Sequence, residues 1–207
     1  MLLAERLRAG ASRVPTDDLL EIHFIGELEV GGPFPNTAAS ERLAVDYAVV
    51  AGSDWVPMCP GEGYSGQTQA ASADSEGMHV FNHPLDLHFF TASIAEWPRL
   101  HVQVLKLDRN GRTQTVSYGS VALPLAPGYQ ELHCRTWAPV STTLRGRVSA
   151  AYGFGSAHLN APRSALLDGR LPEVRSQMIT RTSGAICLTM DTLLRNAHIH
   201  GILMTKT

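Results

Sequence analysis

Long apolar runs are missing from this sequence. None of its 207 residues belongs to a stretch approaching the roughly 20 consecutive apolar residues that a membrane-spanning helix needs. The segment Met1–Arg8 is too short and too charged for the apolar region of a signal peptide. Internal repeats and low-complexity tracts are also absent, and the length is typical of one domain. These absences predict a globular, intracellular protein.

Cysteine is scarce as well. The three cysteines, Cys59, Cys134 and Cys187, are odd in number and share no short metal-ligand spacing. This pattern is typical neither of a disulfide framework nor of a zinc site. Cys134 and Cys187 lie in strand-like segments, which predicts that both are reduced residues of the core.

Motifs that carry catalysis are not found. Gly63-Tyr64-Ser65-Gly66-Gln67 differs from a nucleophile elbow, because its second glycine comes one residue early and no apolar strand precedes it. A hydrolase that uses Ser65 is therefore the weakest of the functional hypotheses. The sequence also lacks a dinucleotide fingerprint and a phosphate-binding loop. We expect no catalytic residue and no cofactor.

Metal-ligand patterns are equally weak, although the chain has nine histidines. His198 and His200 would share one face of a strand, but no carboxylate or cysteine accompanies them. Calcium requires several carboxylates within one or two loops, whereas Asp54, Asp86 and Asp108 are isolated in the sequence. The sequence predicts no metal site.

What the sequence does contain is alternation of apolar and polar residues. Leu85, Leu87 and Phe89 alternate with polar residues, and this period of two is typical of a strand with one buried face. Asn110-Gly111 lies between two such runs and predicts a hairpin, since both residues tolerate positive φ. Further strands are expected over about 21–30, 42–52, 67–70, 78–81, 130–134 and 182–194, with one short helix over 144–152. The pattern predicts an all-β protein, an antiparallel β-sandwich of about eight strands with one short helix and peripheral arms.

Charge is distributed unevenly along the chain. The segment from residue 135 to residue 181 contains seven arginines but only two acidic residues, Asp168 and Glu173. These arginines are Arg135, Arg145, Arg147, Arg163, Arg170, Arg175 and Arg181. The segment is either a solvated basic loop or a contact surface for an acidic partner or an anionic membrane. Nucleic acid is disfavoured, because the pI near 6.5 lacks the usual basic signature.

A series of short motifs resembles the B9-domain family. The series covers about residues 21–194 and consists of Gly52–Pro57, Gly66–Gln69, His83–Leu87, Trp97–Leu100, the strand centred on Gly119 and Pro127-Gly128. The resemblance implies a C2-like β-sandwich without a full set of calcium ligands. It also implies structural roles for the motif residues Asp54, Trp55, Pro57, Trp97, Pro98 and Gly119, with both tryptophans as core or loop anchors.

The motifs divide between two branches of that family. Gly52–Pro57, Phe34-Pro35 and Pro139–Thr142 favour one branch. His83–His88 and Leu193–Asn196 favour the other. The first branch is the preferred interpretation and the second is its alternative.

The resemblance also implies a function. It implies a non-enzymatic scaffold subunit of the ciliary transition-zone complex, cytoplasmic at the base of the cilium, which supports cilium assembly and gates membrane proteins. The implied partners are other B9-domain proteins in a hetero-oligomer and, through the complex, transition-zone membrane proteins. The alternative is a calcium-independent peripheral module that binds anionic lipid.

The expected organisation has three parts. A peripheral arm over 1–18 precedes a B9 domain over 19–196, which carries a basic loop and helix insertion at about 135–181, and a tail follows over 197–207. The candidate contacts for a partner or a lipid are Arg135, Arg145, Arg147, Arg163, Arg170 and Arg175.

Overall fold

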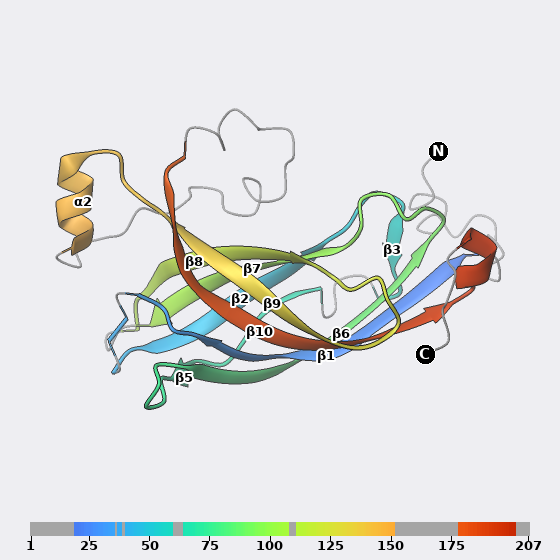
Figure 1. The fold of residues 1–207 in the computed structure, drawn as a ribbon, viewed down its shortest axis with the longest axis horizontal. Helices are drawn as coiled ribbons and strands as arrows, with labels where there is room; N and C mark the ends of the chain where they lie inside the picture. The colour runs from blue at the N-terminus through green and yellow to red at the C-terminus, as the bar shows by residue number, and fades with distance from the viewer. Residues whose placement is uncertain are drawn as a thin grey trace.

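The computed structural model describes residues 19–35, 37–38, 40–59, 64–107, 111–151 and 178–201. The strands are β1 (Leu20–Gly32), β2 (Arg42–Val50), β3 (Trp55–Pro57), β4 (Ser65–Gln67), β5 (Ala71–Ser72), β6 (His79–Thr91), β7 (Arg99–Leu107), β8 (Thr113–Ala122), β9 (Gly128–Pro139) and β10 (Thr180–Arg195). An α-helix, α2 (Leu144–Ala151), and a 3-10 helix, η2 (Ala197–His200), lie at opposite ends of the long axis in Figure 1.

All described strands belong to one curled antiparallel sheet. Its order is β3-β6-β1-β10-β9-β8-β7-β2-β4, with β5 paired to β2. The ladder between β8 and β9 holds only two residue pairs, Tyr118–Trp137 and Gly119–Thr136. Beyond this short junction β8, β7 and β2 turn back over the long strands β1 and β10 (Figure 1). At the far side, His83 Nε2 of β6 lies 3.2 Å from the Tyr47 hydroxyl of β2, so the curled sheet nearly closes.

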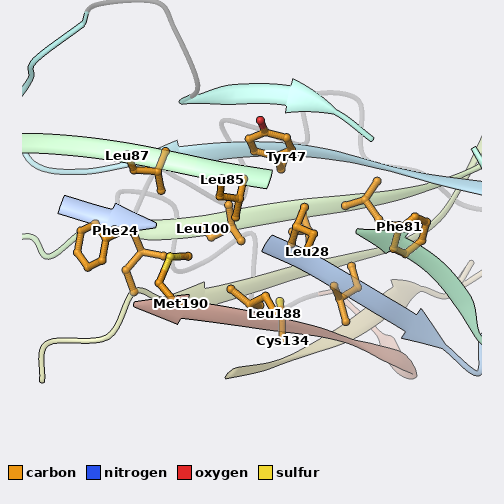
Figure 2. Packing of buried hydrophobic residues seen from close by; sticks show 14 of the residues in the cluster. Phe24, Leu28, Tyr47, Phe81, Leu85, Leu87, Leu100, Cys134, Leu188 and Met190 are labelled. Carbon is orange, nitrogen blue, oxygen red and sulfur yellow. The ribbon is translucent and has the colours of Figure 1, made fainter. Parts of the chain in front are cut away.

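The apolar side chains of both halves meet inside this curl, as Figure 2 shows. In β1, the alternate residues Leu20, Ile22 and Phe24 are fully buried. From the opposite half, Leu100, Val102 and Val104 of β7 join the same cluster. Each such side chain contributes about 1.5–3 kcal/mol when it leaves water. The predicted all-β, C2-like sandwich is thus confirmed, and the period-two pattern correctly identified its buried face.

The number and bounds of the short strands differ from the prediction. The described residues form ten strands rather than about eight, and three of these, β3, β4 and β5, are only two or three residues long. In place of one strand over 67–70, β4 and β5 flank Thr68, whose hydroxyl accepts the backbone N–H of Val45. The segment 78–81 is not separate but begins β6, where Asn82 has a φ of 42° opposite a bulge after Leu28. A strand of two or three residues is too short to show a recognisable alternation of apolar and polar residues.

Of the two residues in the predicted Asn110-Gly111 turn, the structure describes only Gly111. Gly111 has a φ of 76°, as the turn requires, and β7 pairs with β8 on either side of it. Asn110, the expected arm over 1–18 and the end of the tail, residues 202–207, lie outside the described residues.

The two strand cysteines have different surroundings. Cys134 is fully buried, and burial raises the pKa of its thiol to about 12, so it belongs to the core as predicted. Cys187 projects from the opposite face of the sheet and is half-buried, with its Sγ 3.2 Å from His133 Nδ1. The prediction that Cys187 is a core residue is wrong, because its neighbours Ile186 and Leu188 are the inward residues of β10.

His79 makes the fold sensitive to acid. The ring is buried at the start of β6, and neither nitrogen has a hydrogen-bond partner of good geometry among the described residues. Burial lowers the pKa of His79, and backbone groups of Gly31 and Glu41 only partly oppose this. Since the unfolded chain then binds more protons below about pH 6.5, the stability that depends on neutral His79 is lost as pH falls.

We therefore expect His79→Phe to reduce the loss of stability between about pH 7 and about pH 5. Urea unfolding of both proteins at each pH measures it. The matched control is His133→Phe, which makes the same substitution at an exposed ring. Equal pH dependence in the His79→Phe variant and the parent would contradict the explanation.

Candidate functional site

The predicted arginine contacts do not converge on one site in the described structure. Arg135 is exposed on β9 opposite Ala185, and Arg145 is exposed on α2. Arg163, Arg170 and Arg175 lie outside the described residues, as does the side chain of Arg147. Whether these six residues act together stays a prediction.

Helix α2 forms largely as the sequence predicted. The Thr143 hydroxyl accepts the backbone N–H of Gly146 at 3.2 Å, so it serves as an N-cap. Leu144 and Val148 are four residues apart and therefore neighbours on the helix surface. They are 75% and 48% exposed, which leaves beside Arg145 an apolar patch that no described element covers.

The motif tryptophans form one aromatic cluster. The Trp55 and Trp97 rings meet edge to face, with centroids 5.0 Å apart at 82°. Phe89 lies 5.9 Å from Trp55, and Phe24 lies 6.4 Å from Trp97. The Trp55 indole N–H donates to the carbonyl of Ala95 at 2.8 Å. This bond fastens the edge strand β3 to the loop that precedes β7.

A second indole bond extends the cluster to the end of β8. The Trp97 indole N–H donates to the carbonyl of Leu123 at 2.8 Å, and the Leu123 N–H donates to the carbonyl of Pro98 at 3.0 Å. The remaining motif residues sit close by in the chain: Asp54 is in the turn before β3, and Pro57 is the last residue of β3. The two indole N–H groups thus bind backbone carbonyls of Ala95 and Leu123, outside β3.

Gly119 is the motif residue at the sheet junction. A Cβ at this position would come within 2.8 Å of Cys134 Sγ and 2.9 Å of Val102 Cγ2. Since real Cβ atoms essentially never approach so closely, a larger residue here would require the side chain of Cys134 or Val102 to shift.

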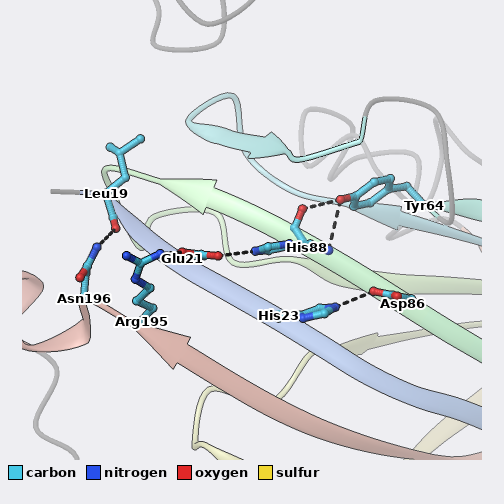
Figure 3. Close-up of polar contacts among 8 residues, drawn as sticks. All are labelled: Leu19, Glu21, His23, Tyr64, Asp86, His88, Arg195 and Asn196. Carbon is cyan, nitrogen blue, oxygen red and sulfur yellow. Dashed lines mark hydrogen bonds and ion pairs between the residues drawn. The ribbon is translucent and has the colours of Figure 1, made fainter. Parts of the chain in front are cut away.

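A polar cluster that sequence reasoning missed lies on the outer face of β1 and β6 (Figure 3). His23 and His88 stack with ring centroids 4.7 Å apart. His23 Nε2 lies 2.6 Å from Asp86 Oδ1, and His88 Nε2 lies 2.8 Å from Glu21 Oε1. Arg195 of β10 also bonds Glu21, at 3.2 Å. Alternation placed Glu21 and His23 on one face, but only the register of β1 with β6 shows which residues oppose them.

Side chains and loop backbone block the free edge of β6. The Tyr64 hydroxyl donates to the carbonyl of His88 and accepts its N–H (Figure 3). Met58 N–H shares the same carbonyl at 2.9 Å, and Gln69 Nε2 donates to the carbonyl of Phe81. The terminal strands β3 and β4 have only three residues each. These features oppose the addition of a further strand at the described edges, so the faces of the sheet are the better candidates for assembly.

The described residues also bear on three other features: an activated serine, a metal site and a membrane-spanning helix. Ser65 is exposed in β4, and its hydroxyl has no hydrogen bond to a histidine in the described part of the chain, so the geometry of an activated serine is not present there. Within the same residues, no three side chains of the metal-binding types are grouped to hold an ion. None of the described helices has the length and apolar character to cross a bilayer.

Comparison with known proteins shows one family. Residues 22–193 match the family of ciliary basal body-associated B9 proteins. B9 domain-containing protein 2 from Rattus norvegicus is 31% identical over 185 residues, which cover 89% of this chain and 99% of that relative. The protein of the same name from Bos taurus is 30% identical over 184 residues, with the same coverage of both chains.

A more distant relative is similar over part of its length only. The Tectonic-like complex member MKS1 of Rattus norvegicus is 30% identical over 142 residues, which cover 62% of this chain and 25% of that protein. Of the two branches that the motifs left open, B9 domain-containing protein 1 was the preferred one. The relatives from Rattus norvegicus and Bos taurus, which cover 89% of this chain, bear the name of the alternative, B9 domain-containing protein 2.

Proposed function

Because this chain belongs to the family of ciliary basal body-associated B9 proteins, we propose that it is a non-enzymatic scaffold subunit of the ciliary transition-zone complex. It binds other B9-domain proteins in a hetero-oligomer at the cytoplasmic base of the cilium. Through this assembly it contributes to cilium formation and to the gating of ciliary membrane proteins.

One observation carries this proposal. The family match spans the fold from β1 to β10, so the sandwich as a whole, rather than a local motif, is the shared unit. A relative that is named as a member of a tectonic-like complex matches 62% of the chain. Short, blocked edges and broad exposed faces suit a subunit that assembles through its surfaces.

Co-purification tests the scaffold function. The chain is co-expressed with two other B9-domain proteins from the same source, and the mixture is run on a sizing column. We expect one stoichiometric peak that contains this chain and at least one of them. A monomer that elutes apart from both would overturn the proposal.

A second candidate function is calcium-independent binding of anionic membranes. The exposed Leu144 and Val148 beside Arg145 favour it, because apolar insertion next to a basic side chain is how interfacial helices bind anionic lipid. Flotation with phosphatidylserine vesicles in the presence of a calcium chelator tests it. Binding that is lost in the Arg145→Glu and Arg147→Glu double variant would support it, whereas no flotation of the parent chain would remove it.

A further inference from the structure

The outer face of β6, β1, β10 and β9 carries an apolar centre. Ile25 lies opposite Asp191 of β10, and Asp191 lies opposite Tyr129 of β9. Leu193 follows two residues after Asp191 on the same face. Ile25, Leu193 and Tyr129 are 44%, 52% and 70% exposed. With strands about 4.8 Å apart and same-face residues about 6.7 Å apart, the three lie within about 10 Å of one another. Grouped exposure of this kind marks interaction surfaces.

Carboxylates surround that centre. Asp86 lies opposite Ile25 on the β6 side, and its side chain is 77% exposed. Asp191 separates Ile25 from Tyr129, and Glu131 follows in the next row of β9 with a 58% exposed side chain. Glu27 pairs across from Thr189 in that row. His23 Nε2 lies 2.6 Å from Asp86 and His133 Nε2 lies 3.7 Å from Glu131, whereas Asp191 and Glu27 have no such partner among the described residues. The centre of the face is therefore both apolar and negatively charged.

The arginines on this face lie at its two ends, whereas the imidazoles of His23 and His133 lie beside the carboxylates of Asp86 and Glu131. Arg195 bonds Glu21 at one end, and Arg135 is opposite Ala185 at the other. Between them run the rows of Asp86, Asp191 and Glu131. An apolar centre with a charged rim has the anatomy of a protein interface. A negative rim attracts a basic surface and repels anionic lipid and nucleic acid.

We propose that this surface, the outer acidic face of Ile25, Asp86, Tyr129, Glu131, Asp191 and Leu193, docks a protein partner with an apolar centre framed by lysine or arginine. A second copy that presents the same face is disfavoured, because the carboxylates of the two copies would repel each other. This assignment rests on the proposed scaffold function and names the surface through which the scaffold holds a basic partner subunit.

Matched variants of equally exposed residues test the apolar part. Leu193→Lys places a charge at the centre of the face, and Ile94→Lys does so at a residue that is also 52% exposed but lies in the loop before β7. Both should unfold at the temperature of the parent chain. We expect Leu193→Lys to weaken binding to the co-purifying B9-domain protein about tenfold or more, and Ile94→Lys to leave it unchanged.

Charge reversal tests the chemistry of the partner. Asp191→Lys with Glu131→Lys should weaken binding to a similar extent, and should remove most of the salt dependence that the parent complex shows. Equal binding by the parent and Leu193→Lys would overturn the surface assignment while the scaffold function stands. If neither added salt nor the double variant changes the affinity, the proposal that the partner surface is basic is overturned.

Two further outcomes would overturn the scaffold function or the identity of the partner. A parent chain that binds no B9-domain protein would overturn the scaffold function and this assignment together. A parent chain that dimerises alone, and that Leu193→Lys makes monomeric, would identify a second copy as the occupant and overturn the basic partner subunit.

Discussion

Trp55→Ala is expected to lower the free energy of unfolding by about 3–5 kcal/mol. The side chain is 5% exposed, contacts the Trp97 and Phe89 rings edge to face, and bonds the carbonyl of Ala95. Its removal leaves a cavity between β3 and β6 and detaches the loop before β7. Urea unfolding followed by far-UV circular dichroism measures the change, since that signal does not depend on the deleted indole.

Two companion variants separate packing from the hydrogen bond. Trp55→Phe keeps an aromatic ring in the cluster but loses the N–H donor, so we expect a loss of about 1 kcal/mol from the bond together with a smaller packing loss. It also provides a measurable value if the alanine variant fails to fold. Ile94→Ala, at a nearby 52% exposed residue, should change stability by less than about 0.5 kcal/mol. A Trp55→Ala protein as stable as Ile94→Ala would contradict an anchoring role.

The predictability of the fold follows from the length of its strands. Long strands such as β1 and β7 repeat the apolar alternation often enough to specify both the strand and its buried face. β4 and β5 instead exist because β2 offers backbone partners to Gln67 and Ala71, and this pairing is not encoded in the local residue pattern. The motif series added the C2-like class, which alternation alone could not distinguish from other sandwiches.

The candidate site was less predictable for the same physical reason. The arginines stand out by composition, yet Arg135 and Arg145 lie on different elements. The outer acidic face depends on the register of four strands, which joins residues as distant in sequence as Ile25, Tyr129 and Leu193. No single segment is unusually acidic or apolar, so only the assembled sheet reveals the face.

The two faces of the described sheet differ in burial, so we expect inward residues to determine stability and outward residues to affect binding. Inward residues of β10 such as Leu188 and Met190 are fully buried, whereas their outward neighbours Asp191 and Leu193 are exposed. A substitution on the outer face can therefore alter binding at little cost in stability. A substitution on the inner face acts mainly through folding.

Gly26→Ala is the inner-face substitution with the strongest expected clash. Gly26 pairs with Met190 of β10, and an added Cβ would overlap the carbonyl oxygen of Thr189 and come within 2.9 Å of the Met190 Cα. Because these are backbone atoms, no side-chain movement relieves the overlap. We expect a loss of about 3 kcal/mol or more in the free energy of unfolding, at the upper end of overpacking effects. Urea unfolding measures it, with the outward Glu27→Ala as the control.

Gly119→Ala provides the contrasting case and keeps the explanation testable if Gly26→Ala does not fold. Its Cβ would meet side-chain atoms, Cys134 Sγ at 2.8 Å and Val102 Cγ2 at 2.9 Å. Truncating one of these neighbours should therefore recover part of the loss, so Gly119→Ala should cost less in a Cys134→Ala background than in the parent chain. A cost that is the same in both backgrounds would show that the close approach at the β8–β9 junction is not what requires glycine there.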